Sequence, residues 1–265
     1  MVLPVVKYGH PVLRQRGALA DPEMEGLEEL LNNMLETMDD ANGIGLAAHQ
    51  INLAIQLTVI DVSDAKERES AMWVDDEPVD IDDFMPLVLM NPKIEPQGES
   101  ESGQEGCLSF PDVYGEVSRP KTINVEALQP DGSTLRFRCE GLLSRAVQHE
   151  TDHLNGILFI DRMDRASKDK IRTEIDVLHA ETKLDLLVIK QAVRDCGSKD
   201  IDISSKALSY FISDDFKKLA KRNHIDADMV RGAVGSLSAY PLLSRKKLAN
   251  DMAKEIDAVW VKKIT

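Results

Sequence analysis

Residues 141–156, which read GLLSRAVQHETDHLNG, constrain the fold most, because they join a helical pattern to a paired-histidine motif. The closing Asn-Gly is a typical helix stop. On a helix, positions i and i+4 share a face, so His149 and His153 present both imidazoles to one point. Glu150 lies about 100° around the helix, where a base acting on metal-bound water belongs. The motif predicts a metal site, although a solvated helix can carry such a pair by chance.

A catalytic site of this kind needs a third protein ligand and an open position. Common H-E-x-x-H peptidases take that ligand from downstream, as Glu or as a second-motif His. Phe159 occupies the position where that His would fall, while a downstream Glu stays open. Upstream, Cys107 lies in EGCLSFP, where its neighbours indicate a shaped, exposed backbone. We interpret Cys139 and Cys196 as small buried apolar residues.

The stretch GIGLAAHQ, residues 43–50, has two glycines that allow close backbone approach. It lacks the Gly-Lys-Ser/Thr and the preceding strand of a phosphate loop. The amide of Gln50 could donate to a developing oxyanion. Leu142 and Ala146 share the helical face of His149, so they line either a pocket beside the metal or ordinary core.

Apolar spacing predicts a helix that starts at Asp21-Pro22 and ends near residue 43. Strand patterns cover residues 53–61, 86–94, 121–128 and 134–139. PDGS, residues 130–133, predicts a hairpin turn between the last two strands. We expect the acidic residues 63–83 to form a solvated loop. Another helix is expected from Ser167, followed by helices at residues 213–224, 226–239 and 244–263.

Charge divides the 265-residue chain into an acidic body and a mildly basic tail. Residues 1–175 carry 16 Lys+Arg and 33 Asp+Glu, a net charge of −17, and residues 176–265 carry +3. No apolar run approaches the length of a membrane span, and the N-terminus resembles neither a signal nor a transit peptide. Three widely spaced cysteines argue against a disulfide framework and favour a reducing, cytoplasmic location.

Three motifs together resemble the peptide deformylase family. The family patterns are G-x-G-x-A-A-x-Q, E-G-C-L-S and Q-H-E-x-D-H, and this sequence has GIGLAAHQ at 43–50, EGCLS at 105–109 and QHETDH at 148–153. The resemblance covers about residues 1–175, which it implies are a catalytic domain. It implies an α+β fold, with antiparallel β-sheets packed around a central helix that carries H-E-x-x-H. Residues 176–265 depart from the family and form an expected α-helical C-terminal extension of unknown role.

The implied reaction removes the formyl group from the N-terminal formyl-methionine of new polypeptides and releases formate. By resemblance, Cys107, His149 and His153 hold one divalent metal ion, most typically Fe2+, with Zn2+, Ni2+ or Co2+ as alternatives. The resemblance implies that Glu150 is the general acid–base. It also implies that the Gln50 side-chain amide and the Leu108 backbone N–H donate hydrogen bonds to the oxyanion. Gly45, Leu142 and Ala146 would bind the substrate. Arg119, Glu105 and Asp152 are interpreted as structural charge pairs.

Two other classes stay open: a different metallohydrolase with a downstream Glu ligand, and a ribosome-associated binding protein with a vestigial site. No membrane and no sequence-specific nucleic acid is expected as a partner. The tail clusters its bases, with Lys217, Lys218, Lys221 and Arg222 in one predicted helix and Arg245, Lys246 and Lys247 in another. Such clusters bind phosphates without sequence preference, so we expect ribosome docking through the tail or, alternatively, packing of the tail.

Overall fold

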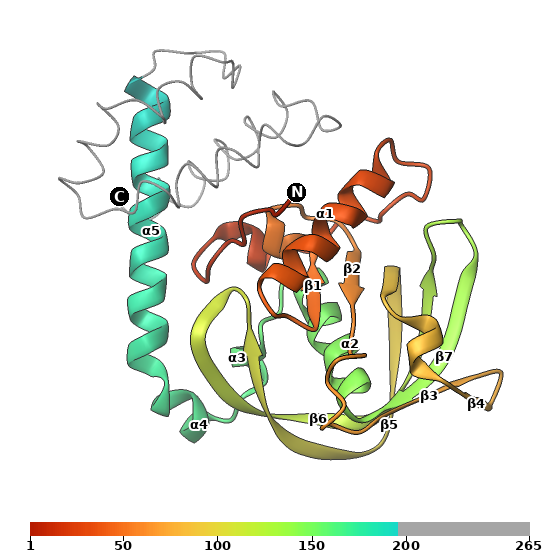
Figure 1. Ribbon diagram of the computed structural model, residues 1–265. Helices are drawn as coiled ribbons and strands as arrows, with labels where there is room; N and C mark the ends of the chain where they lie inside the picture. Colours follow the sequence, from red (N-terminus) through yellow and green to blue (C-terminus); the bar gives the residue numbers. More distant parts are fainter. Residues whose placement is uncertain (196–265) are drawn as a thin grey trace. The chain divides into compact units, whose positions relative to one another are not determined.

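The computed structural model describes residues 1–195 (Figure 1). One compact unit comprises residues 1–8 and 12–176, and a second contains residues 9–11 and begins again at residue 177. The strands are β1 (Gly45–Ala47), β2 (Leu57–Ile60), β3 (Ser70–Val74), β4 (Glu77–Val79), β5 (Leu87–Cys107), β6 (Phe110–Leu128) and β7 (Thr134–Glu140). The helices are α1 (Leu27–Asp40), α2 (Gly141–Leu154), α3 (Phe159–Arg162), α4 (Arg165–Lys170) and α5 (Arg172–Asp195).

All seven strands form one antiparallel sheet in the order β1-β2-β5-β6-β7-β3-β4. The longest part of this sheet is the β5–β6 hairpin, whose register runs from Met90↔Leu128 to Cys107↔Phe110. Three register shifts interrupt this pairing, and irregularities of that kind bend a strand pair. The hairpin turn predicted at residues 130–133 is confirmed between β6 and β7. The fold is therefore α+β, as expected.

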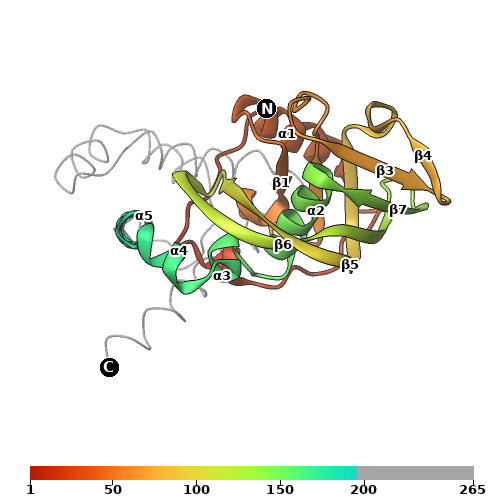
Figure 2. The same ribbon diagram turned by 90° about the horizontal axis from the view of Figure 1, so that it is seen from below.

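Helix α2 lies against the inner face of the curved sheet in both ribbon views (Figures 1 and 2). It contacts β1, β2, β3, β5, β6 and β7. The core between them contains Ile60, Leu89, Ile123, Phe137, Leu143 and Val147. Every residue of α2 from Leu142 to Leu154 is buried, including its charged and polar side chains. Buried charges require partners, so this helix must be matched by polar groups on the strands around it.

Helix α1 begins at Leu27, so the predicted start at Asp21-Pro22 is wrong. The Asp21 carboxylate accepts a hydrogen bond from the backbone N–H of Glu23, which closes a local turn instead of a helix. Gly26 then takes a left-handed backbone conformation with φ of 70°. The apolar pattern from Leu27 onward matches the buried face, and only the start was misplaced.

The expectation of a loop at residues 63–83 is also wrong. Strands β3 and β4 form a hairpin there, and β3 pairs with β7. The backbone carbonyl of Glu69 accepts from the N–H of Leu142, and the Ser70 hydroxyl accepts from the N–H of Leu143. The hairpin thus supplies acceptors to the first turn of α2, whose N–H groups have no partner within the helix. The acidic composition of residues 63–83 favoured a loop, and the pairing of β3 with the distant strand β7 could not be read from that segment.

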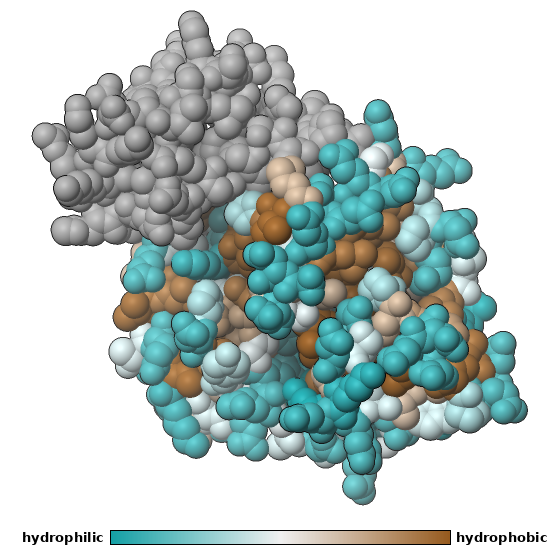
Figure 3. All heavy atoms as spheres, viewed as in Figure 1, coloured by the Kyte–Doolittle hydropathy of each residue, from teal (hydrophilic) through white to brown (hydrophobic). Residues whose placement is uncertain are grey.

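The helix expected from Ser167 begins two residues earlier, at Arg165, because the Asp164 carboxylate caps it by accepting from the Ser167 N–H. The helices predicted at residues 213–224, 226–239 and 244–263 lie outside the described residues. No helix among residues 1–195 combines the length and apolar character needed to cross a membrane. The face shown in Figure 3 is largely hydrophilic over the described part, with apolar patches between the charged side chains.

Candidate metal centre

Three predicted ligands, Cys107 at the end of β5 and His149 and His153 on α2, come together in the structure. Their ligand atoms lie within 4.8 Å of one another, and Cys107 Sγ is 3.2 Å from His153 Nε2. Among residues 1–195, this is the one group of three or more His, Cys or acidic side chains arranged to hold a metal ion. Thiolate and imidazole suit several first-row metals, so the donor set fits such an ion.

The surroundings of His149 also fit a cation. Its Nδ1 lies 2.9 Å from Glu105 Oε2, which leaves Nε2 for a metal, the usual arrangement of a metal-binding histidine. Burial alone would lower the pKa of His149, yet Cys107 and Glu105 raise it well above the ordinary value. The site therefore stabilises positive charge at this point. Burial lowers the pKa of His153 well below its ordinary value, so this imidazole stays neutral.

A buried charge network holds His149 in place. Arg119 donates to Glu105 Oε1 at 2.6 Å and Oε2 at 2.9 Å, and to Asp152 Oδ2 at 2.8 Å. Burial would raise the pKa of Glu105, but hydrogen bonds from His149 and Arg119 outweigh it and hold that pKa well below its usual range. Glu105 therefore stays ionised beneath His149. Its predicted structural role includes direct contact with a candidate ligand, which the sequence pattern did not reveal.

Glu150 lies in the same pocket with its carboxylate set against β1. A Cβ at Gly45 would lie 2.5 Å from Glu150 Oε1, so only glycine leaves room for this carboxylate. Burial raises the pKa of Glu150 to about 7, against the opposing charges of His149 and Arg119. Oε2 has no hydrogen-bond partner among the described residues. A carboxyl group that titrates near neutral pH can both accept and return a proton.

The orientation of the Gln50 side chain is fixed by its own backbone turn. Its Oε1 accepts from the backbone N–H of Ala47 at 2.8 Å, which directs Nε2 toward Cys107 Sγ, 3.5 Å away. Gln50 is only 1% exposed. The amide is thus a preorganised donor beside the candidate metal ligands, and such a donor is effective where negative charge develops.

These groups share a pocket of about 500 Å³. Its wall includes all the predicted site residues except His153, namely Gly45, Gln50, Cys107, Leu108, Leu142, Ala146, His149 and Glu150. The wall also contains residues that the motifs did not indicate, among them Arg68, Tyr114 and Arg145. A single sequence carries little signal for these three, because hairpin register and helix docking bring them to the pocket.

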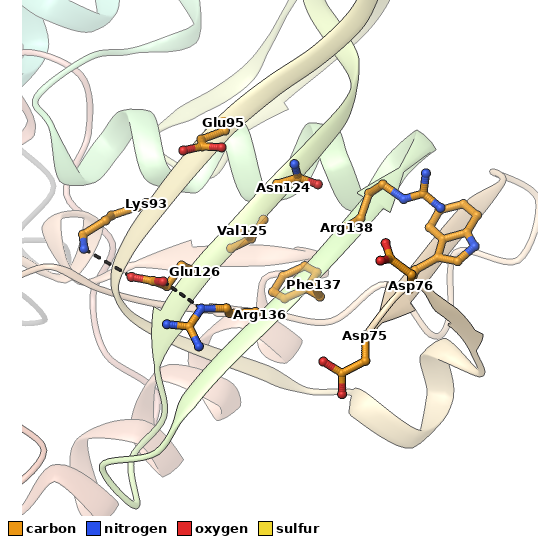
Figure 4. A pocket seen from close by; sticks show the side chains of 11 residues that line it. Asp75, Asp76, Lys93, Glu95, Asn124, Val125, Glu126, Arg136, Phe137 and Arg138 are labelled. Atoms are coloured by element: carbon orange, nitrogen blue, oxygen red, sulfur yellow. Dashed lines mark hydrogen bonds and ion pairs between the residues drawn. The ribbon is translucent and has the colours of Figure 1, made fainter.

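A second hollow, of about 520 Å³, lies on the outer side of β3, β5, β6 and β7 (Figure 4). Glu126 pairs there with Lys93 at 3.2 Å and with Arg136 at 2.9 Å. The Arg138 guanidinium stacks on the Trp73 ring, 4.1 Å from its centroid. The ion pairs are exposed, and exposed pairs contribute little to stability. The metal-binding group found among residues 1–195 lies at the first pocket, not in this hollow.

Comparisons with known proteins give the family of this chain. The family model described as Polypeptide deformylase matches residues 2–169. A peptide deformylase of Opitutus terrae is 40% identical over 185 residues, covering 69% of this chain and 96% of that protein. One of Methylacidiphilum infernorum is 40% identical over 176 residues, covering 66% of this chain and 92% of its own. The crystal structure of peptide deformylase from Thermus thermophilus matches with a TM-score of 0.57 and 34% identity, covering 68% of this chain and 99% of that one.

Proposed function

The chain belongs to the polypeptide deformylase family, and on that premise we propose how its residues remove the N-formyl group from newly made polypeptides. The enzyme is a hydrolase, and formate is the second product. The observation that carries the assignment of residues is the meeting of Cys107, His149 and His153 within 4.8 Å, beside the buried carboxylate of Glu150.

Cys107, His149 and His153 would hold one divalent metal ion. When bound, such an ion polarises a carbonyl oxygen and lowers the pKa of a water molecule toward neutrality. We assign Fe2+ as the physiological ion, and Zn2+, Ni2+ or Co2+ also suit a site of one thiolate and two imidazoles. Glu105 orients His149 through the 2.9 Å contact, and Arg119 holds Glu105 in turn.

Glu150 moves the proton. It accepts a proton from the attacking water at the formyl carbon and returns it to the leaving amine, which becomes the new N-terminus. A pKa of about 7 matches this double role, because the carboxyl can be in either form near neutral pH. Gly45 keeps the space into which the carboxylate reaches.

Gln50 and Leu108 supply the oxyanion donors. The Gln50 amide is held by the Ala47 N–H and points Nε2 toward Cys107, and Leu108 follows Cys107 at the tip of the β5–β6 hairpin. Removing one such donor costs about 3–4 kcal/mol of barrier. The methionine side chain packs on Leu142 and Ala146, which precede His149 by about two turns and about one turn of α2 in the pocket wall.

Residues 1–175 form the proposed catalytic domain, supported by the family match to residue 169 and the compact unit that reaches residue 176. Residues 176–265 are then an extension, which we propose docks the enzyme on the ribosome in the cytoplasm through its basic clusters. The test replaces Lys217, Lys218, Lys221 and Arg222 with Gln in the full chain and measures ribosome co-sedimentation at two salt concentrations. Docking predicts weaker, less salt-sensitive binding, whereas unchanged binding contradicts it.

The test of the catalytic assignment is formate release from formyl-Met-Ala-Ser by protein purified without oxygen, with metal analysis of the same sample. We expect one equivalent of divalent metal and release that stops on chelation. Cleavage of internal peptide bonds without formate release would instead indicate a peptidase. One equivalent of bound metal without formate release or peptide cleavage would indicate a vestigial site.

A further inference from the structure

Asparagine is followed directly by glycine at two places in the chain, Asn42-Gly43 and Asn155-Gly156. Both asparagines are exposed, and they lie just past the ends of α1 and α2. An asparagine side chain is chemically labile, because the backbone nitrogen of the next residue can attack its carbonyl carbon. Glycine in that next position lacks the side chain that would hinder the attack. The surroundings of the two pairs differ, and the difference singles out one of them.

The Asn155-Gly156 pair is fixed by its neighbours. Asn155 Nδ2 donates to the Thr151 carbonyl at 2.9 Å. A Cβ at Gly156 would lie 2.7 Å from the carbonyl oxygen of Arg14, so the backbone of another segment closes over this glycine. Both contacts would have to change before the Gly156 nitrogen could reach the Asn155 side chain. This pair is therefore protected in the folded protein.

Asn42 lacks both restraints. Its side chain has no hydrogen-bond partner among residues 1–195. The atom nearest to a Cβ at Gly43 would be Leu108 Cδ1, at 2.9 Å, which is the end of a side chain and not backbone. The Gly43 N–H donates to the Met38 carbonyl at 2.8 Å, at the end of α1. Helix ends open easily, so this nitrogen is released whenever the last turn of α1 frays.

We propose that Asn42 is a site of spontaneous deamidation. The Gly43 backbone nitrogen attacks the side-chain carbonyl carbon of Asn42, and the new C–N bond closes a succinimide ring. The bond from that carbon to the amide nitrogen breaks, and ammonia leaves with the proton that the Gly43 nitrogen gives up. Water then opens the ring at one of its two carbonyls, which yields aspartate or isoaspartate. In the isoaspartate product the main chain is one carbon longer between residues 42 and 43.

The modified segment forms part of the wall of the reaction pocket. Asn42, Gly43 and Gly45 all line that pocket. Gly43 lies against the Leu108 side chain. Gly45 leaves room for the Glu150 carboxylate, since a Cβ there would lie 2.5 Å from Oε1. A longer main chain before Gly43 displaces this segment from both neighbours, so we expect the isoaspartate form to lose formate release. That loss rests on the proposed function, whereas the modification itself does not.

The test incubates the full chain, with bound divalent metal and without oxygen, in a mildly alkaline buffer that favours the attack. Samples taken over time are digested under mildly acidic conditions, so that the digestion adds no modification. Mass spectrometry maps the deamidated peptides, and chromatography separates their aspartate and isoaspartate forms. Deamidation should accumulate at Asn42 well before it appears at Asn155. Formate release from formyl-Met-Ala-Ser should fall in proportion to the fraction of protein with isoaspartate at position 42.

Asn42→Gly is the matched control. Residue 42 has φ of 52°, a conformation that glycine adopts readily, so the variant should fold while it lacks the reactive amide. Over the same incubation it should keep its own starting rate of formate release. An equal loss of activity in this variant and in the parent would overturn the proposed effect on the pocket, and so would full activity in parent protein that carries isoaspartate.

The site itself is overturned if Asn42 stays intact throughout the incubation, or if Asn155 is deamidated as fast as Asn42. Absence of formate release from the parent before incubation would instead contradict the proposed function, and the peptide map would still decide whether Asn42 is modified.

Discussion

His49 makes the stability of this protein depend on pH in a calculable way. It lies in the short 3-10 helix η2 (Ala48–Ile51), directly before Gln50, and is fully buried. Its packing is tight, since a Cβ at Gly17 would lie 2.8 Å from His49 Cε1. Burial lowers its pKa from 6.5 to about 4, against a smaller opposite effect from the backbone of Gln15. The imidazole is therefore neutral in the folded protein at neutral pH.

The sign follows from proton linkage. Between pH 6.5 and about pH 4 the unfolded chain binds a proton at residue 49 that the folded protein does not, so stability falls as pH falls through this window. The full shift corresponds to about 3 kcal/mol at 1.36 kcal/mol per pH unit, and the part lost between about pH 7 and pH 5 is about 2 kcal/mol. Above the unfolded pKa of 6.5 the group contributes no pH dependence.

The assay is urea unfolding of the parent and of His49→Gln, both metal-free in chelator so that metal linkage is absent. Glutamine has a similar size and does not titrate, so subtraction removes the other titrating groups. The free-energy difference between the two proteins should change by about 2 kcal/mol from pH 7 to pH 5, with the parent losing more. Parallel pH dependences would refute the reasoning, because they would mean that residue 49 takes up no extra proton on unfolding.

Glu150→Ala should retain metal but lose about 10²–10⁴-fold in formate release, and near-normal turnover would remove it from the mechanism. Arg119→Met removes the cation that Glu105 and Asp152 share, and each carboxylate keeps one other arginine, Arg145 or Arg162. The loss should be about 1–3 kcal/mol in urea unfolding, so an unchanged free energy of unfolding would contradict the network. Gly141→Ala adds a Cβ that collides with the Glu69 carbonyl at φ of +70°. It should destabilise more than Gly132→Ala, where φ is +81° but the space is open, and equal melting shifts would argue against the contact.

The sequence predicted those elements of the fold whose signal lies within a few neighbouring residues. The α2 motif, the hairpin turn before β7 and the apolar stripe of α1 each lie within a short stretch, and the structure has all three. The β3–β4 hairpin was missed because acidic residues flank and separate its two short strands. The β7 residues that pair with β3 also lie far away in the sequence, as in Ala71↔Glu140. The start of α1 was missed because Asp21-Pro22 is an equally good turn signal.

In the candidate site, too, residues within motifs could be predicted, whereas contacts between distant residues could not. His149 could be named from its own motif, whereas Cys107 was named only through the resemblance of the three motifs to a family. The contact of Glu105 with His149 and the clearance at Gly45 depend on strand register and helix docking. A single sequence does not contain those distances, so only the fold could supply them.

The central claim is that Cys107 is the third metal ligand. The metal content of Cys107→Ala tests this claim most directly. Cys139→Ala is the matched control, since Cys139 is buried in β7 and away from the pocket. Both variants and the parent are purified without oxygen and analysed for bound divalent metal. The account predicts that Cys107→Ala loses its metal and its formate release together, while Cys139→Ala keeps both. Full metal occupancy in Cys107→Ala would contradict the account.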